Sequence, residues 1–270
     1  MYGAIIGDMV GAPYEFDRSP KIKDFGPLFI QESCYTDDSM MTIAIADAIM
    51  TVGSDADEQT VKSQFVTSMQ KWGRKYPDAG YGGMFYNWLY ESNPQPYGSY
   101  GNGSAMRVSS VGWLFDSLEK TREVARWSAE VTHNDPEGIK GAEATATAIY
   151  MARTGKSKDE IRDYIISEFG YDLSQTCGDI RPWYKFDVTC QGTIPVATIA
   201  FYEGKDFEDV IRTAVSLGGD CDTLTCIAGG MAEAFYGVPD ELQRMCDERL
   251  PDDALNVVHS FRATVNSIKS

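Results

Sequence analysis

Residues 137–154 have the sequence EGIKGAEATATAIYMART, and this stretch decides the fold that we expect. Glycine or alanine occupies nearly every side of the helix that it would form, at positions 138, 141, 142, 144, 146 and 148. The distance between packed helices depends on the side chains at their contact, so small residues allow a close approach. We therefore place this segment at the centre of the molecule.

The segments on either side show the apolar spacing of amphipathic helices. Residues 57–73 place apolar side chains at steps of four, four and three, from Val61 to Trp72, which is one helix face. Ser157 and Glu160 have the spacing of a capping box at the start of a later helix. The further helices that we expect are residues 121–132, 157–169, 206–217, 239–249 and 252–268.

Strand patterns are nearly absent from the sequence. No segment shows sustained alternation between turn signals, and the nearest candidate, residues 183–189, is short. We therefore predict an all-α fold, with about ten or more helices around one core, in a single domain of residues 1–270. Two long loops, residues 92–104 and 170–193, interrupt the helices, and loops of this length are usually functional.

The charge balance excludes several classes of protein. The 270 residues include 40 acidic and 24 basic side chains, which give a formal net charge of −16. Nucleic-acid binding is disfavoured, because contacts to phosphates need a basic surface. The two histidines, His133 and His259, are too few for a three-histidine zinc site. A phosphorylated ligand would have to be neutralised by backbone N–H groups or bound cations.

The chain carries no sign of secretion or of a membrane span. Its six cysteines include no CxxC pair, which disfavours a zinc knuckle and a thioredoxin motif. The first residues, MYGAIIGDMVG, lack the basic region of a signal peptide and reach Asp8 early. The longest uncharged stretch of the C-terminal half, residues 189–202, is shorter than the roughly 20 residues that a bilayer requires. We expect a monomeric protein of the reducing cytoplasm without membrane contact.

Two acidic clusters each precede a helix-like segment. They are TDDS at residues 36–39 and GGDCDT at residues 218–223. Either alone is explained by helix capping, since acids in a first turn interact favourably with the helix dipole. Together they offer four carboxylates and two hydroxyls, an oxygen set that Mg²⁺, Mn²⁺ or Ca²⁺ prefers. Converging carboxylates repel unless cations lie between them, so the pair predicts a site for two cations. The expected ligands are Thr36, Asp37, Asp38, Asp220, Asp222 and Thr223.

Two further patterns have two interpretations each. Glycines recur every four residues at 3, 7 and 11, and Asp8 and Glu15 lie seven residues apart on one helix face. These two acids are either a solvated face or buried carboxylates. The stretch GSYGNGSAMR at residues 98–107 either presents backbone N–H groups to a phosphate or is a tight connector. A lone histidine in a loop, such as His133, is more often a surface or capping residue, and we assign His259 to helix packing.

Six blocks of sequence, taken together and in order, resemble the ADP-ribosylglycohydrolases. The blocks are GAIIGDMVGAPYE, YTDDSM, YPDAGYGG, SYGNGSAMR, THNDPEG and GGDCDT, and they are spread over most of the chain. Each block alone is weak, whereas their number and order make the match specific. The resemblance implies an all-α fold with a binuclear Mg²⁺ or Mn²⁺ centre. It also implies an enzyme that releases ADP-ribose from arginine N-linked or serine O-linked ADP-ribosylated protein, by hydrolysis at the distal ribose.

The same resemblance assigns roles to individual residues. The six expected ligands match the two metal-binding triplets of the family. Glu15 matches a glutamate that binds metal or activates water, and Asp78 matches an aspartate near the scissile bond, so that either is the general acid or base. His133 matches a histidine that contacts the ligand near the distal ribose. The loop that would hold the diphosphate of ADP-ribose is Gly98, Ser99, Tyr100, Gly101, Asn102 and Gly103.

Some features depart from the family or leave alternatives. Pro94 stands where a serine-directed member has the aromatic residue that stacks on adenine, which leaves Tyr97 or Tyr100 for that role. Residues 186–192 are either a second ligand contact or the entry to a helix. A terpene synthase is disfavoured because Ser39 follows the two aspartates where its motif needs a third acid. The remaining alternatives are a hydrolase of small-molecule or nucleic-acid-linked ADP-ribose and a non-catalytic ADP-ribose-binding relative.

Overall fold

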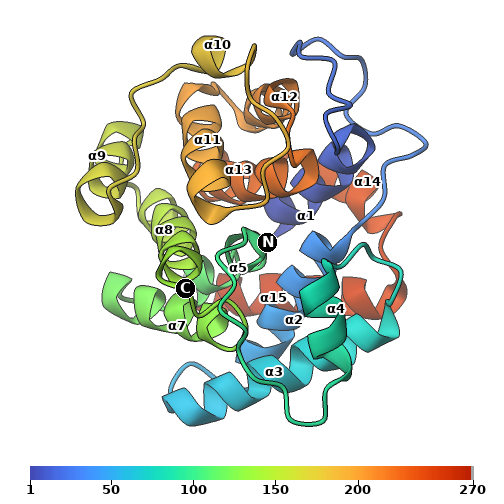
Figure 1. Ribbon diagram of the computed structural model, residues 1–270, viewed down its shortest axis with the longest axis vertical. Helices are drawn as coiled ribbons and strands as arrows, with labels where there is room; N and C mark the ends of the chain where they lie inside the picture. Colours follow the sequence, from blue (N-terminus) through green and yellow to red (C-terminus); the bar gives the residue numbers. More distant parts are fainter. Residues whose placement is uncertain (269–270) are drawn as a thin grey trace.

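The computed structural model describes residues 1–268, and helices make up most of them (Figure 1). Within this range there is no β-strand, only an isolated antiparallel bridge between Gly101 and Thr189. The predicted all-α fold is confirmed. Residues 269 and 270, the last two of the predicted domain, lie outside the described residues. No helix in the described part of the chain is both long and apolar enough to cross a bilayer.

Fifteen α-helices and one short 3₁₀ helix are formed by the described residues. They are α1 (Tyr2–Gly11), the 3₁₀ helix (Ala12–Tyr14), α2 (Asp37–Val52), α3 (Glu58–Lys75), α4 (Gly83–Tyr90), α5 (Gly103–Met106), α6 (Val111–Leu114), α7 (Leu118–Glu130), α8 (Pro136–Arg153), α9 (Lys158–Phe169), α10 (Cys177–Ile180), α11 (Cys190–Glu203), α12 (Phe207–Leu217), α13 (Cys221–Tyr236), α14 (Asp240–Asp247) and α15 (Asp252–Ile268).

Most predicted helices are present, with shifts at their ends that local contacts explain. The capping box of α9 forms as expected, with Ser157 and Glu160 each bonding the backbone of the other. Helix α7 begins three residues before the predicted start, because the Ser117 side chain accepts a hydrogen bond from the Lys120 amide and caps it there. Helix α14 ends at Asp247, two residues early. The first predicted loop ends with the first two residues of α5, and the second contains the short helix α10 and the first turn of α11.

Two expectations about side chains are wrong. Helix α1 ends at Gly11 and the chain continues through a 3₁₀ helix that contains Pro13, so Asp8 and Glu15 do not share a helix face. His259 does not pack in the core. Its side chain is 54% exposed, because the buried face of α15 is formed by its neighbours Val258 and Phe261 instead.

The centre of the molecule is a tight pair of helices, α1 and α13, which lie side by side in Figure 1. All ten residues of α1 are buried. A Cβ at Gly3 would overlap the carbonyl oxygen of Gly229, and one at Gly7 would overlap that of Thr225, so only glycine permits this approach. Helix α8 is central as predicted, since it contacts α5, α6, α7, α9, α11 and α13.

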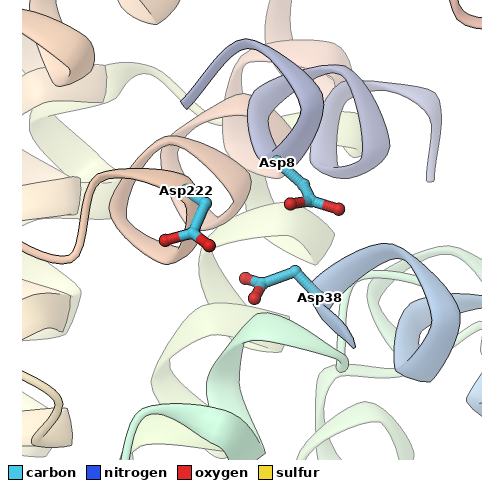
Figure 2. A group of neighbouring side chains, drawn as sticks. All are labelled: Asp8, Asp38 and Asp222. Carbon is cyan, nitrogen blue, oxygen red and sulfur yellow. The ribbon is translucent and has the colours of Figure 1, made fainter. Parts of the chain in front are cut away.

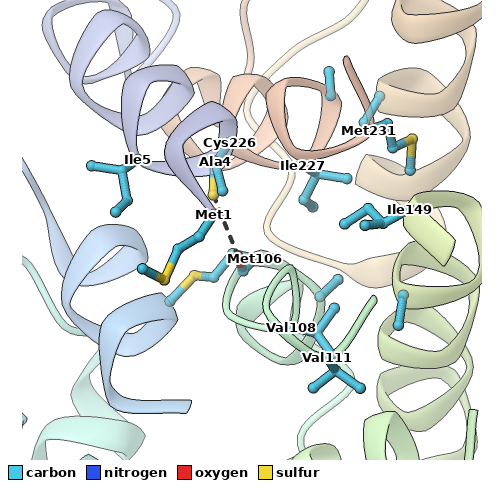
Figure 3. Packing of buried hydrophobic residues seen from close by; sticks show 14 of the residues in the cluster. Met1, Ala4, Ile5, Met106, Val108, Val111, Ile149, Cys226, Ile227 and Met231 are labelled. Carbon is cyan, nitrogen blue, oxygen red and sulfur yellow. Dashed lines mark hydrogen bonds between the residues drawn. The ribbon is translucent and has the colours of Figure 1, made fainter. Parts of the chain in front are cut away.

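The core continues from this pair toward α2, α5 and α8 (Figure 3). Side chains of α1, α13 and α8, including Ile5, Met231 and Ile149, are completely buried. The Met106 carbonyl at the end of α5 accepts hydrogen bonds from the Cys226 thiol of α13 at 3.4 Å and from the Thr42 hydroxyl of α2 at 3.2 Å. The short helix α5 is thereby fixed between two long helices.

The two loops that sequence analysis singled out lie against each other. The Asn102 amide donates to the Val188 carbonyl at 2.8 Å, and the Cys190 amide donates to the Tyr100 carbonyl at 3.0 Å. These backbone bonds place the glycine-rich loop beside the entry to α11. The chain also turns sharply before α13, where Gly218 and Gly219 have φ of 75° and 76°, a conformation that favours glycine.

Candidate active site

Asp8 joins the start of α2 to the buried helix α1. Its carboxylate is fully buried and accepts hydrogen bonds from the Thr36 amide at 2.9 Å, the Thr36 hydroxyl at 2.6 Å and the Ser39 amide at 3.0 Å. The Ser39 hydroxyl also donates to it. Sequence analysis left Asp8 open between a solvated and a buried acid and did not include it among the ligands. The residues around Asp8 in this helix are apolar or small, and this was the signal in the sequence that Asp8 is buried.

Three aspartates from three helices point toward one another (Figure 2). They are Asp8 of α1, Asp38 of α2 and Asp222 of α13, and one carboxylate oxygen of each lies within 4.8 Å of the other two. Glu15, Asp220 and Asp222 form a second trio that meets the same criterion. Asp222 belongs to both trios, so the two groups form one continuous cluster.

Burial raises the pKa of all five acids of the two trios and of the neighbouring Asp37. The pKa values of Asp38 and Asp222 lie well above the ordinary range, first through burial and then through the charges of nearby aspartates. The same two causes raise the pKa of Asp37 to about 8 and that of Glu15 to about 7. Burial raises the pKa of Asp8 to about 6, although its four hydrogen bonds act in the opposite direction. The cluster therefore favours protons or cations over free negative charge.

The cluster has the properties of a site for hard divalent cations. Its donors are all oxygens, which Mg²⁺ and Mn²⁺ prefer. The Oδ1 atom of Asp38 is buried and has no hydrogen-bond partner among the described residues. No ion pair in the described part of the chain involves any carboxylate of the two trios. Buried carboxyl groups of this kind are stable when they are protonated, paired with a cationic side chain or bound to a metal.

The six expected ligands differ in how close they lie to the carboxylate cluster. Asp38, Asp220 and Asp222 belong to the trios, and Asp37 lines the cavity beside them. The Thr223 hydroxyl donates to Asp38 Oδ2 at 3.2 Å. The Thr36 hydroxyl is directed to Asp8 and lies 3.5 Å from Asp38 Oδ2. The first acidic stretch caps its helix through the Thr36 side chain, which accepts from the Asp38 amide, whereas Asp220 makes no side-chain cap on α13. Both turns deliver carboxylates to the cluster.

A cavity of about 350 Å³ opens beside the carboxylates. The acids that line it are Glu15, Asp37, Asp38, Asp220 and Asp222. Its apolar lining includes Phe16, Met84, Phe85, Phe186 and Val188. Phe186 and Val188 belong to the segment whose role the sequence left open, and they contribute to the cavity wall. The rings of Phe16 and Phe186 are in contact, with their centroids 5.1 Å apart.

Four residues of the glycine-rich loop line the cavity, namely Ser99, Gly101, Asn102 and Gly103. The Asn102 side chain is directed to the acidic cluster and donates to Asp220 Oδ2 at 2.7 Å and to Thr193 Oγ1 at 3.0 Å. Gly98 and Tyr100 are not part of the lining, and Tyr100 is 51% exposed.

Of the two tyrosines considered for stacking, Tyr97 lines the cavity, next to the His133 ring. His133 is buried and also lines the cavity. Its Nδ1 lies 2.7 Å from the Thr132 hydroxyl. Burial, together with the positive charge of Arg107, lowers the pKa of His133 well below its ordinary value, so the ring is neutral at physiological pH. Arg107 itself lines the cavity and was not singled out by sequence analysis.

The two acids considered for proton transfer occupy different environments. Glu15 is half-buried and lines the cavity. Asp78 is exposed and does not belong to the lining, although Gly80, Gly82 and Gly83 of the same loop do. This loop is attached to α2 by a hydrogen bond from the Asp37 amide to the Ala79 carbonyl at 2.8 Å.

The fold and the site together define an all-helical protein with a buried centre of carboxylates beside a cavity. The chain belongs to the ADP-ribosylglycohydrolase family, whose model matches residues 1–266. The predicted family and the prediction of a glycosidic bond hydrolase are thereby confirmed.

Known relatives match over most of the chain. ADP-ribosylhydrolase ARH3 of Bos taurus is 26% identical and covers 94% of this chain and 89% of its own. ARH3 of Homo sapiens is 25% identical over 91% of this chain and 87% of its own. ADP-ribosylarginine hydrolase Tri1 of Pseudomonas putida (strain GB-1) is 25% identical over 88% of this chain and 70% of its own.

A solved structure shows that the fold is shared. It is described as an ADP-ribosylglycohydrolase-related protein complex, and it superposes with a TM-score of 0.73 over 97% of this chain and 95% of its own. The two chains are 21% identical in sequence, so the likeness concerns the fold.

Proposed function

We propose that this protein is a metal-dependent hydrolase that removes ADP-ribose from ADP-ribosylated protein side chains. The bond cleaved joins the distal ribose to an arginine nitrogen or a serine oxygen. The observation that carries the proposal is the pair of carboxylate trios that share Asp222 at the edge of a cavity bordered by a glycine-rich loop. Relatives named ADP-ribosylhydrolase and ADP-ribosylarginine hydrolase have nearly equal identity to the chain, which keeps both linkages as candidates.

The metal centre in this proposal contains two Mg²⁺ or Mn²⁺ ions. Asp8, Asp38 and Asp222 would hold one of them, and Glu15, Asp220 and Asp222 the other. Such ions, when bound, fix hydroxyl groups of a sugar and lower the pKa of water. The remaining ligands in the proposal are Thr36, Asp37 and Thr223.

The chain's own residues would orient the substrate. Ser99, Gly101, Asn102 and Gly103 line the cavity, which supports this loop, with Gly98 and Tyr100 at its edge, as the place for the diphosphate of ADP-ribose. A Cβ at Gly103 would lie only 2.9 Å from His133 Nε2, so glycine keeps the loop and the ring in contact. The neutral ring of His133 supports its role as a contact to the ligand.

Proton transfer would be carried out by Glu15. In the proposed reaction, the oxygen of water joins the anomeric carbon, the bond to the side-chain nitrogen or oxygen breaks, and the leaving atom takes a proton. Burial and the charge of Asp220 raise the pKa of Glu15 in the metal-free protein. The cations that Glu15 helps to hold would lower it again, so Glu15 would act as the carboxylate that takes a proton from water. Asp78 was the other candidate, and its exposed position outside the cavity lining makes it less suitable. Carboxylates beside the anomeric carbon would stabilise the oxocarbenium-like transition state.

The test is release of ADP-ribose from defined substrates. Arginine-linked, serine-linked, small-molecule-linked and nucleic-acid-linked ADP-ribose are each incubated with the protein in Mg²⁺, in Mn²⁺ and in chelator. We expect metal-dependent release from the arginine or the serine substrate, and none from Asp222→Asn, which lacks the acid shared by the trios. Release from neither protein linkage, with or without metal, would refute the proposal. Release from a small-molecule or nucleic-acid substrate alone would establish that alternative, and binding of ADP-ribose without any release would indicate a non-catalytic relative.

Three broader expectations complete the proposal. We propose that residues 1–270 form one domain, that the protein is a monomer and that it acts in the cytoplasm. Light scattering after size-exclusion chromatography tests the monomer, and a peak at twice the monomer mass would contradict it. Calorimetry tests the single domain, and two separate unfolding transitions would contradict that expectation.

A further inference from the structure

Arg107 is a buried cation without an acidic partner. Its side chain is 1% exposed, and no ion pair among the described residues includes it. One terminal nitrogen, Nη2, donates to the Ser128 carbonyl and to the Thr132 hydroxyl, both at 2.7 Å. A buried charge satisfied only by neutral groups is costly, so its position calls for an explanation beyond packing.

The hydrogen bonds of Thr132 have only one consistent direction. Arg107 can only donate, so the Thr132 oxygen accepts from it. The single hydroxyl proton of Thr132 is then free to be donated, and the atom within reach is His133 Nδ1 at 2.7 Å. If Nδ1 instead donated to the second lone pair of the Thr132 oxygen, the buried Thr132 proton would have no acceptor among the described residues, so we assign Nδ1 as the unprotonated nitrogen of the ring. In a neutral histidine the other nitrogen, Nε2, then carries the proton.

His133 Nε2 is directed to the place where the ligand would bind. It would lie 2.9 Å and 3.5 Å from Cβ atoms built on Gly103 and Gly101, so this edge of the ring faces the glycine-rich loop. No hydrogen bond to Nε2 is formed by the described residues, and His133 lines the cavity. The donor is thus available to an external oxygen.

We propose that Arg107, acting through the Thr132 hydroxyl, is a positioning residue that holds His133 as the tautomer protonated on Nε2. The ring then presents an N–H donor to an oxygen of bound ADP-ribose. The tautomer is a property of the protein alone, and only the identity of the bound group rests on the proposed function. The charge of Arg107 beside the ring also disfavours a second proton on it, which keeps Nδ1 an acceptor.

The tautomer is measured by NMR on protein labelled with ¹⁵N-histidine. The chain contains only His133 and His259, and the exposed His259 serves as an internal reference. We expect long-range ¹H–¹⁵N correlations in which His133 has an unprotonated Nδ1 and a protonated Nε2, unchanged between pH 6 and pH 8. Thr132→Val should replace this pattern by exchange between both tautomers, whereas Thr132→Ser should retain it. Thr145→Val is the matched control, because the buried Thr145 hydroxyl has no partner in the described structure.

The possible results distinguish a positioning role of Arg107 and Thr132 from a role in packing alone. A Thr132→Val protein that is less stable but keeps the Nε2–H tautomer, or a wild-type spectrum with the proton on Nδ1, would overturn the proposal. So would an Arg107→Met protein that folds and keeps the wild-type pattern. Thr132→Val retains the charge of Arg107, so it decides the question even where Arg107→Met does not fold.

The ligand part is tested by titration with ADP-ribose. We expect a shift of the His133 Nε2–H resonance on binding, and about tenfold weaker binding to Thr132→Val than to Thr132→Ser, the size of one lost hydrogen bond to a ligand. Binding to wild type without that shift would overturn the donor role. Absence of ADP-ribose binding would instead count against the proposed function, while the tautomer result still stands.

Discussion

At the scale of single residues, Asp38 shows how a buried carboxyl group of the site is held without a cationic partner. Its Oδ2 is close to the hydroxyls of Thr223 and Thr36, at 3.2 Å and 3.5 Å, while its buried Oδ1 has no partner among the described residues. Burial and the charge of Asp222 raise the pKa of Asp38 well above its ordinary value. In the absence of metal this side chain destabilises the folded protein, whether it is protonated or ionised at neutral pH.

Asp38→Asn is therefore expected to change stability in opposite directions with and without metal. In chelator at pH 8, the free energy of unfolding should rise, because the raised pKa of Asp38 means that the unfolded chain ionises more easily than the folded one, and an asparagine removes that difference. The increase in Tm should be roughly 2–4 °C per kcal/mol. The additional rise that Mg²⁺ or Mn²⁺ causes in wild type should be largely lost, because a ligand is missing. Thermal unfolding followed by circular dichroism measures both effects.

The control for this prediction is Asp57→Asn. Asp57 caps α3 at the surface, and its amide replacement is also a good N-cap. This variant should keep the full metal-induced rise. A fall in the Tm of Asp38→Asn in chelator would show that the carboxylate is not under repulsion.

At the scale of elements, the contact between α1 and α13 sets the geometry of the cluster. Three glycines of α1, at positions 3, 7 and 11, face the backbone of α13 at Gly229, Thr225 and Cys221. This close approach brings Asp8 of one helix and Asp222 of the other into the same trio. The regular glycine spacing was visible in the sequence, but its partner helix, more than 200 residues away, was not.

Gly7→Ala is expected to damage both the fold and the site. The new Cβ would overlap the Thr225 carbonyl oxygen and would force the helices apart, which costs about 1–3 kcal/mol of unfolding free energy or more. Because Asp8 follows Gly7, metal affinity should also fall, as measured by calorimetric titration. Gly178→Ala, where the nearest atom is 3.5 Å from the added Cβ, should have neither effect. Wild-type stability of Gly7→Ala would mean that the two helices tolerate a wider separation.

Patterns among neighbouring residues predicted the helices well. Features that depend on contacts between distant segments could not be predicted from the sequence. The capping box of α9 needs only Ser157 and Glu160, which are three positions apart, so the sequence was sufficient there. The prediction that His259 packs in the core was wrong, because the apolar residues around it do not reveal which face of α15 meets the core. Helix α1 ends at Gly11, shortly before Pro13. The seven-residue spacing of Asp8 and Glu15 therefore did not place them on one helix face.

At the scale of the whole molecule, the carboxylate cluster makes stability depend on pH and on metal together. The folded-state pKa values of Asp37 and Glu15, about 8 and about 7, exceed the ordinary values of 3.8 and 4.5 that hold in the unfolded chain. Between pH 6.5 and pH 8 the folded protein then binds more protons than the unfolded one. Stability must fall as pH rises through this window, because ionisation is easier after unfolding.

The expected result is a Tm in chelator that decreases from pH 6.5 to pH 8. Saturating Mg²⁺ or Mn²⁺ should remove or reverse this slope, since metal binding requires deprotonated carboxylates and improves as pH rises. Thermal scans at constant ionic strength provide the measurement. A Tm in chelator that is constant or rising over this range would contradict the raised pKa values of the cluster.

The sequence by itself determined the helices, their caps and the two acidic turns, because these depend on residues within a few positions of each other. It also identified the family, since the order of six short blocks is a property of the chain. Only the tertiary structure decided which oxygens meet. Asp8 enters the cluster because α1 docks on α13, and Asn102 holds Asp220 because two loops are bonded side by side. Asp78 remains at the surface, although its loop borders the cavity. These outcomes depend on distances between residues far apart in the chain, which only the packing of the helices sets.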